Sequence, residues 1–212
     1  MPRRKRARRF IRSLELKLYV RGSIPAGGIA VIGSRTPPPE AVEFAYRFAA
    51  GLHEPVVSGL APGIDAAAHR GALSAGIVTV AFVGYGFGRT DPPELRELED
   101  AIVAAGGAVA TMLAPGTPAT PQTRIARDRL QAERARMVVL VCSEIAGGAM
   151  HTMRFARELG RPRFAVEPPA RAVDPAWDGN RRCIAEGAAP LPFDAVAALT
   201  AILRGHEDGG EG

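Results

Sequence analysis

A glycine, a serine and an arginine directly follow one apolar run of the chain, at Gly33, Ser34 and Arg35. The glycine allows a ligand to approach the backbone, the hydroxyl can donate or accept, and the guanidinium carries a permanent charge on a planar fork of donors. These are residue types that bind phosphate. A tight turn with a solvent-facing arginine explains the same three residues equally simply.

A second glycine-rich segment, SGLAPGIDAAAH, contains Ser58, Gly59 and Gly63 and continues into a helical pattern. We expect Asp65 to cap that helix, whose first amides would favour an anion. Asp65 and His69 are four residues apart and share a helix face. Because no nucleophile lies beside them in sequence, a capping aspartate and a packed histidine explain them better than a catalytic pair.

The segment VGYGFGRTDPP, residues 83–93, resembles the start of a dinucleotide-binding fingerprint. Arg89 stands where the third glycine should be, so this signal is weak. Tyr85 and Phe87 have rings on which bases could stack. Their alternative role is to cover the edge of the sheet.

An arginine-rich helical segment follows, with Arg124, Arg127 and Arg129 close to Asp128. On a helix Arg124 and Arg127 share a face with Asp128, whereas Arg129 turns away. One or two of these arginines are therefore expected in a binding crevice, although a solvated helix face would look the same.

A further glycine pair, Gly147 and Gly148, precedes a helical segment that has Thr152 in its first turn. Backbone amides at such a helix start form a cradle suited to an anion. This makes a second candidate phosphate site.

Apolar runs of strand length alternate with helical patterns along the chain, which predicts a single α/β domain with a doubly wound, mostly parallel sheet of the extended Rossmann-like kind. Such sheets bind ligands beyond the carboxyl ends of their strands, where the segments above lie. The predicted strands are 29–33, 55–58, 78–83, 108–112, 137–142 and 163–166. The predicted helices are 39–52, 66–75, 93–105, 123–135, 150–159, 181–186 and 193–204.

The net charge of +5 over 212 residues is unevenly distributed. Residues 1–22 hold nine Lys or Arg and one Glu, so the rest of the chain is slightly acidic. We expect residues 1–22 to be a flexible basic arm, 23–204 to form the domain, and 205–212 to be a disordered acidic and glycine-rich tail. The arm either binds phosphates or is simply solvated.

No apolar stretch is long enough to span a membrane, and no apolar region follows the Arg-rich N-terminus as in a secretory signal. Cys142 and Cys183 lack metal-ligand spacing and do not form a disulfide framework. We therefore expect a cytoplasmic protein without a metal or cofactor.

Several segments together resemble the DNA-processing protein A family, also called Smf, over roughly residues 15–195. The matching strings are LYVRGS, IAVIGSR, VVSGLAPGIDAAAHRGAL, TRIARDRL, VVLVCSEIAGGAMHT, RPRFAV and DGNRRCIAEGAAPL. The resemblance implies a protein that binds single-stranded DNA, protects it and hands it to the RecA recombinase during natural transformation, usually as a homodimer and without catalysis. It places the predicted DNA-binding residues at Gly33, Ser34, Arg35, Ser58, Gly59, Gly63, Arg124, Arg127, Arg129, Gly147, Gly148 and Thr152.

Two departures from the family pattern affect this assignment. The usual Arg-Asn-Arg is Arg127-Asp128-Arg129, which adds a negative charge near the proposed phosphates. A loop normally rich in hydroxyl groups is GGAMHT, which retains Thr152. The accessory domains of many members do not fit in this length, so the basic arm is a possible substitute for lost affinity.

Two alternatives remain open on sequence grounds. Related phosphoribohydrolases remove the base from a nucleoside monophosphate, but Phe155 stands where their motif has a carboxylate. A sensor of a nucleotide or nucleotide-derived signal would use the same crevice and suits the acidic body.

Overall fold

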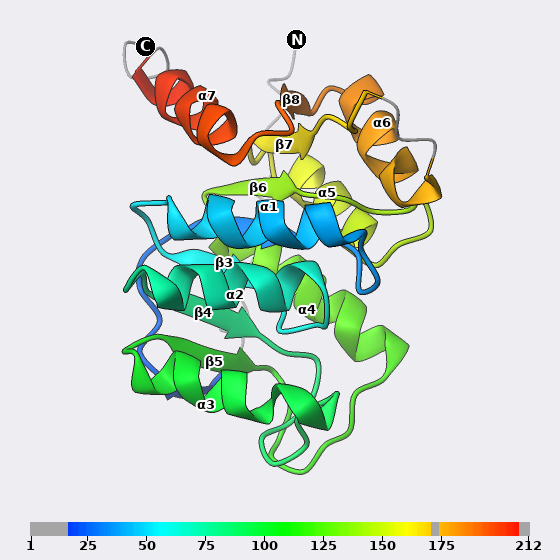
Figure 1. Ribbon diagram of the computed structural model, residues 1–212. Helices are drawn as coiled ribbons and strands as arrows, with labels where there is room; N and C mark the ends of the chain where they lie inside the picture. Colours follow the sequence, from blue (N-terminus) through cyan, green and yellow to red (C-terminus); the bar gives the residue numbers. More distant parts are fainter. Residues whose placement is uncertain (1–16, 171–173, 208–212) are drawn as a thin grey trace, which may run out of the picture.

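The computed structural model describes residues 17–170 and 174–207, which form one α/β domain around a single sheet (Figure 1). The strands are β1 (Tyr19–Gly22), β2 (Ile29–Ile32), β3 (Val56–Ser58), β4 (Thr79–Phe82), β5 (Ala108–Thr111), β6 (Met137–Leu140), β7 (Arg163–Val166) and β8 (Ala189–Leu191). The α-helices are α1 (Pro39–Ala50), α2 (Ile64–Ser74), α3 (Arg96–Ala104), α4 (Pro121–Arg134), α5 (Ala149–Glu158), α6 (Asp178–Ala185) and α7 (Ala195–Glu207). Two short 3₁₀ helices are η1 (Pro93–Leu95) and η2 (Pro175–Trp177).

The strands lie in the order β1-β5-β4-β3-β2-β6-β7-β8, and every neighbouring pair is parallel except β1 and β5. The chain therefore builds outward from β2 through β3, β4 and β5, and then returns to add β6 on the other side of β2. This is the doubly wound topology that the alternating pattern predicts. Its switch point lies between β2 and β6, where crossover loops leave the sheet in opposite directions.

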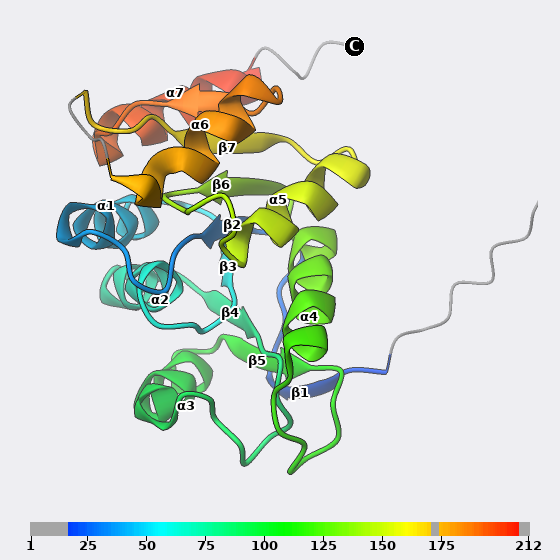
Figure 2. The same ribbon diagram turned by 90° about the vertical axis from the view of Figure 1, so that its right-hand side faces the viewer.

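The central strands are apolar on both faces because helices cover both. In β2, Ile29 and Val31 pack with α1 and α2, whereas Ala30 and Ile32 pack with α4 and α5. Figure 2 shows α1, α2 and α3 on one side of the sheet and α4 and α5 on the other. This double layer explains why the central predicted strands read as largely apolar runs rather than as alternating ones, whereas 163–166, nearer the edge of the sheet, begins with a half-buried arginine.

The sequence pattern does not predict the two edge strands, β1 and β8, and β1 changes the expected domain boundary. Residues 1–22 were predicted to be an arm, but Tyr19–Gly22 pair with β5 as β1. Arg21 holds this strand in place through ion pairs with Glu99 at 2.8 Å and Asp100 at 2.7 Å. The expected arm can therefore reach only to about residue 18, and its first sixteen residues lie outside the described part of the chain.

At the other end of the chain, α7 continues to Glu207, three residues past the predicted domain boundary. The expected disordered tail falls mainly on residues 208–212, which are outside the described residues. Within residues 17–170 and 174–207, no helix is both long and apolar enough to cross a membrane.

Candidate nucleic-acid interface

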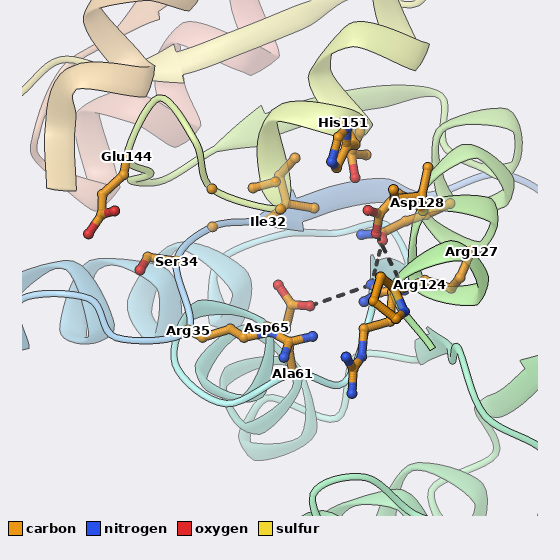
Figure 3. A pocket seen from close by; sticks show the side chains of 18 of the residues that line it. Ile32, Ser34, Arg35, Ala61, Asp65, Arg124, Arg127, Asp128, Glu144 and His151 are labelled. Atoms are coloured by element: carbon orange, nitrogen blue, oxygen red, sulfur yellow. Dashed lines mark hydrogen bonds and ion pairs between the residues drawn. The ribbon is translucent and has the colours of Figure 1, made fainter. Parts of the chain in front are cut away.

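A cavity of about 410 Å³ opens at the carboxyl ends of β2 and β6, directly at the switch point of the sheet. Four segments line this cavity: the loop after β2, the start of α2, helix α4, and the loop from β6 into the start of α5. Figure 3 shows side chains from these four segments converging on the same space. Of the twelve predicted binding residues, those that line this cavity are Gly33, Ser34, Arg35, Arg124, Arg127, Gly147, Gly148 and Thr152.

The loop after β2 is held rigidly against its neighbours. The amide of Ser34 donates to the carbonyl of Cys142 at 2.8 Å, and the carbonyl of Ser34 accepts from Ile64 at 3.2 Å. A Cβ on Gly33 would lie 2.6 Å from a side-chain carbon of Ile64, so only glycine fits. This leaves Arg35 exposed at the mouth of the cavity, where it makes no ion pair among the described residues.

Three predicted residues of the second loop support the cavity from behind rather than lining it. The Ser58 hydroxyl is fully buried and donates to the carbonyl of Val31 at 2.7 Å, and the Gly59 amide donates to Asp65 at 3.1 Å. Gly63 has φ +79, a conformation that favours glycine, and a Cβ there would lie 2.5 Å from the carbonyl oxygen of Ser34. Their polar groups are therefore already engaged within the protein.

Asp65 is not the helix cap that the sequence suggested. The cap position is Gly63, and Asp65 lies in the first turn of α2 with its carboxylate turned inward. Burial raises the pKa of Asp65, while the charge of Arg127 and hydrogen bonds from neighbouring groups lower it. The aspartate therefore belongs to a buried charge cluster that connects α2 to α4.

Arg127 is the centre of that cluster. Its side chain is 9% exposed and lies between two carboxylates, with Nη1 3.8 Å from Asp65 and Nε 3.4 Å from Asp128. Nη1 also donates to Oε1 of Gln131 at 3.1 Å. A Cβ on Gly59 would overlap the guanidinium, so this glycine provides the space that Arg127 occupies.

Asp128 lies on the wall of the cavity with its side chain 10% exposed. Burial raises its pKa to about 6, and the nearby charge of Asp65 adds to this, while Arg127 and Arg35 act in the opposite direction. The carboxyl group thus titrates close to neutrality. Keeping Asp128 ionised in the cavity therefore lowers the free energy of unfolding.

His69 is packed rather than catalytic, as the sequence analysis favoured. Its ring is fully buried, and Nδ1 lies 2.7 Å from the hydroxyl of Thr79. Burial lowers its pKa to about 3, with further lowering from the charges of Arg127 and Arg70. His69 is therefore neutral at physiological pH and does not line the cavity.

The remaining arginines of α4 divide as helix geometry predicts. Arg124 reaches the mouth of the cavity and pairs with Asp91 at 2.5 Å. Arg129 points away, pairs with Glu133 at 3.0 Å and lies over the ring of Phe155 at 5.6 Å. The cavity therefore contains Arg124 and Arg127 but not Arg129.

The loop after β6 provides a second backbone wall. A Cβ on Gly147 would overlap the hydroxyl of Ser143, whereas a Cβ on Gly148 meets nothing within 4 Å. Gly148 precedes the first residue of α5, where the amides of Met150 and His151 donate to the carbonyls of Gly147 at 3.1 Å and Gly148 at 3.0 Å. Among the described residues, the amides of Gly148 and Ala149 are the ones in this segment left without a partner. Together with buried Thr152, this loop is open toward the cavity.

The expected aromatic platform is not formed by Tyr85. The side chain of Tyr85 is 3% exposed, and its hydroxyl donates to the carboxylate of Glu99 at 3.0 Å. Phe87 is half-buried against the same core. Tyr85 follows the central strand β4 and packs in a core cluster with Leu98 and Ile102 of α3, so it does not cover an edge of the sheet either.

Sequence reasoning did not select four polar residues that line the cavity, namely Thr36, Gln131, Glu144 and His151. Gln131 follows Arg127 by one helical turn, so its position on the same face of α4 was available from spacing alone. Glu144 and His151 flank the glycine pair, and their place depends on the path of a loop.

A model of the family described as DNA recombination-mediator protein A matches residues 6–200 of this chain. The chain belongs to that family. The DNA processing protein DprA of Streptococcus pneumoniae is 33% identical over 162 residues, which are 76% of this chain and 56% of that protein. The putative DprA of Mycobacterium tuberculosis is 39% identical over 143 residues, 66% of this chain and 36% of the relative.

Solved structures agree with this membership. The S. pneumoniae DprA structure superposes with a TM-score of 0.77 at 30% identity, covering 85% of this chain and 65% of that one. DNA processing protein A from Helicobacter pylori gives a TM-score of 0.76 at 21% identity, covering 88% and 86%, which shows a shared fold. The chain thus spans only part of the length of the curated family members named above.

Proposed function

We propose that this chain binds single-stranded DNA in the cavity at the switch point, with the sugar-phosphate backbone against Arg35, Ser34 and the loop at Gly147 and Gly148. In this proposal it protects incoming DNA and loads RecA in the cytoplasm during transformation, as a homodimer. Family membership supports this role, and the H. pylori protein of the same fold binds single-stranded DNA.

The observation that carries the proposal is the position of Arg35. Its guanidinium is exposed at the mouth of the cavity, has no ion pair among the described residues, and lies beside two glycine loops. An unpaired arginine next to backbone amides is suited to a phosphate because it adds charge where the amides add direction. Such contacts are tolerant of sequence.

The test is an oligonucleotide titration that compares single with double strands across a salt series. We expect tighter binding of single strands, and affinity that falls steeply with salt because phosphate contacts release counterions. Arg35→Ala should weaken binding and reduce the slope of log affinity against log salt by about 0.7 for one lost contact. Unchanged binding by this variant would remove the cavity as the site.

Arg47→Ala is the matched control for that variant. Arg47 is exposed in the last turn of α1. Because a crossover helix runs antiparallel to the strands, this residue lies toward their amino ends, whereas the cavity lies at their carboxyl ends. Arg47→Ala therefore removes the same charge as Arg35→Ala, but at a position away from the cavity. We expect a change in affinity much smaller than that of Arg35→Ala.

We also propose that the chain does not cleave nucleotides. Phe155, at the position of the carboxylate in the related phosphoribohydrolases, is packed between α4 and α5, with Arg154 over its ring at 4.7 Å. It does not line the cavity. Incubation with AMP should therefore release no adenine, and release of adenine would overturn this part of the proposal.

A nucleotide sensor is the second candidate, and the size of the cavity favours it. Asp65, Asp128 and Glu144 all line a space whose volume suits one small ligand. Thermal-shift measurements with free nucleotides and short oligonucleotides separate the two functions, because the ligand that binds the native state more tightly raises its melting temperature more at equal concentration.

A further inference from the structure

The cavity has two chemically different ends. At its mouth lie the exposed Arg35 and the exposed glycine Gly148. Deeper along α4 lie Asp128 and Gln131, both buried and both lining the same space. A negatively charged phosphate suits the mouth, whereas the inner end presents a carboxylate.

The carboxylate of Asp128 has unused capacity to accept hydrogen bonds. Its one ion pair among the described residues is with Nε of Arg127 at 3.4 Å, and neither oxygen accepts a hydrogen bond within the described part of the chain. A carboxylate has about four acceptor sites and normally fills them when it is buried. A ligand group that offers N–H donors at the inner end of the cavity would fill these sites.

Gln131 places an unused donor beside that acceptor. Its Oε1 accepts from Arg127, which leaves Nε2 as the donor end of the amide. Nε2 is buried and has no hydrogen-bond partner among the residues that the structure describes. Because Gln131 follows Asp128 by three residues on α4, the two side chains share one helix face.

We propose that this acceptor and donor pair reads a nucleobase of the bound strand and selects guanine. Guanine presents two adjacent donors, N1–H and the 2-amino group, which fit the two oxygens of one carboxylate, and beside them the O6 acceptor fits the amide of Gln131. Apolar Ile32 and Ile125 line the same cavity and suit the faces of a flat ring. The inference rests on the proposed single-strand binding and adds base selectivity to it.

The other bases match this pair less well. Adenine and cytosine each offer one amino group and one ring acceptor, so they form one fewer hydrogen bond with Asp128. Thymine offers a single N–H between two carbonyl oxygens, one of which would face the carboxylate. The expected order of affinity is therefore guanine first, adenine and cytosine next, and thymine last.

Fluorescence anisotropy with a labelled thymidine strand and the same strand carrying a few separated guanines tests this order. We expect the guanine-containing strand to bind about tenfold more tightly, as for one good bidentate base contact. Replacing those guanines by hypoxanthine, which lacks the 2-amino group, should lose a large part of the preference.

Two variants assign the preference to Asp128. Asp128→Asn keeps the shape of the side chain but cannot accept two parallel N–H groups, so the preference should collapse. Glu144→Gln removes an exposed carboxylate of the same cavity, and should strengthen binding of both strands by the same factor while keeping their ratio. Circular dichroism checks that both variants are folded.

The outcomes separate the inference from the proposed function. Equal affinity for the guanine and thymidine strands, or a guanine preference that survives in Asp128→Asn, overturns base reading while single-strand binding stands. Failure of the wild-type protein to bind any of the strands overturns the proposed function, and base reading with it.

Discussion

Replacing Asp128 by asparagine should make the protein more stable at pH 7.5. Burial raises the pKa of this carboxyl group from 3.8 to about 6, so the folded protein retains the charged form at a cost. Asparagine has nearly the same shape and no charge. The substitution therefore removes the cost without opening a hole in the wall of the cavity.

The size of the effect follows from the two pKa values. Each pKa unit corresponds to about 1.36 kcal/mol, so the difference between 3.8 and about 6 gives about 3 kcal/mol as an upper value. A domain of this length gains about 2–4 °C in Tm for each kcal/mol. The variant should therefore melt higher than the wild type at pH 7.5, by up to about 6–12 °C.

The direction of this pKa shift also predicts how the stability difference between the two proteins depends on pH. The folded protein binds the proton more tightly than the unfolded chain, so the wild type becomes more stable relative to the variant as the pH falls through about 6 toward 3.8. The advantage of Asp128→Asn should therefore be full near pH 7.5 and reduced to about a fifth at pH 4, where the carboxyl group of the unfolded chain is still partly ionised. His69 contributes an opposite trend, because its pKa is about 3 in the fold, but it does so in both proteins.

Urea denaturation of both proteins at pH 7.5 and pH 4 measures this difference directly. We expect the midpoint of the variant to lie up to about 1 M higher at pH 7.5 and no more than about 0.2 M higher at pH 4. Glu144→Gln is the control, since an exposed carboxylate changes stability by at most about 0.5 kcal/mol. A variant that is less stable at pH 7.5, or whose advantage is the same at both pH values, would refute the reasoning.

Three further predictions concern residues around the cavity. Tyr85→Phe should lower stability in urea denaturation by about 1.5–3 kcal/mol, because it removes a buried hydrogen bond to the carboxylate of Glu99. Its DNA affinity should stay unchanged, and a loss of affinity would restore a stacking role. Gly59→Ala should lower the free energy of unfolding by about 1–3 kcal/mol, since its Cβ would displace the guanidinium of Arg127. A melting temperature equal to that of the wild type would contradict this contact between Gly59 and Arg127. Removing residues 1–16, which leaves β1 intact, should lower affinity for single strands and flatten its salt dependence; identical titration curves would show that these residues take no part.

The central sheet was predictable because burial on both faces leaves a plain signal in sequence. Strands such as Met137–Leu140 are apolar throughout and lie between helical patterns. The edge strands lack that signal: Tyr19–Gly22 is half exposed and contains an arginine, and Ala189–Leu191 contains Pro190, which is tolerated at an edge. Their pairing depends on partners far along the chain.

The site was predictable where it depends on local geometry. Glycine loops at the ends of parallel strands and the helical spacing of Arg124 and Arg127 brought most of the lining residues to one place. The burial of Tyr85 was not predictable, because it depends on Glu99, which is fourteen residues away on another element. The inward turn of Asp65 likewise depends on Arg127, which belongs to a helix from the other half of the chain.

The direction of β1 has a consequence for the basic N-terminal residues. Because β1 runs antiparallel to β5, Tyr19 pairs with Thr111 at the carboxyl end of that strand. The residues before Tyr19 are therefore attached at the same rim of the sheet as the cavity, four strand spacings from β2, or about 19 Å. A parallel β1 would have attached this basic segment, whose surplus of positive charge exceeds the net charge of the whole chain, to the opposite rim. Reversing one four-residue strand thus determines whether a single polyanion can reach both the cavity and the basic segment at once.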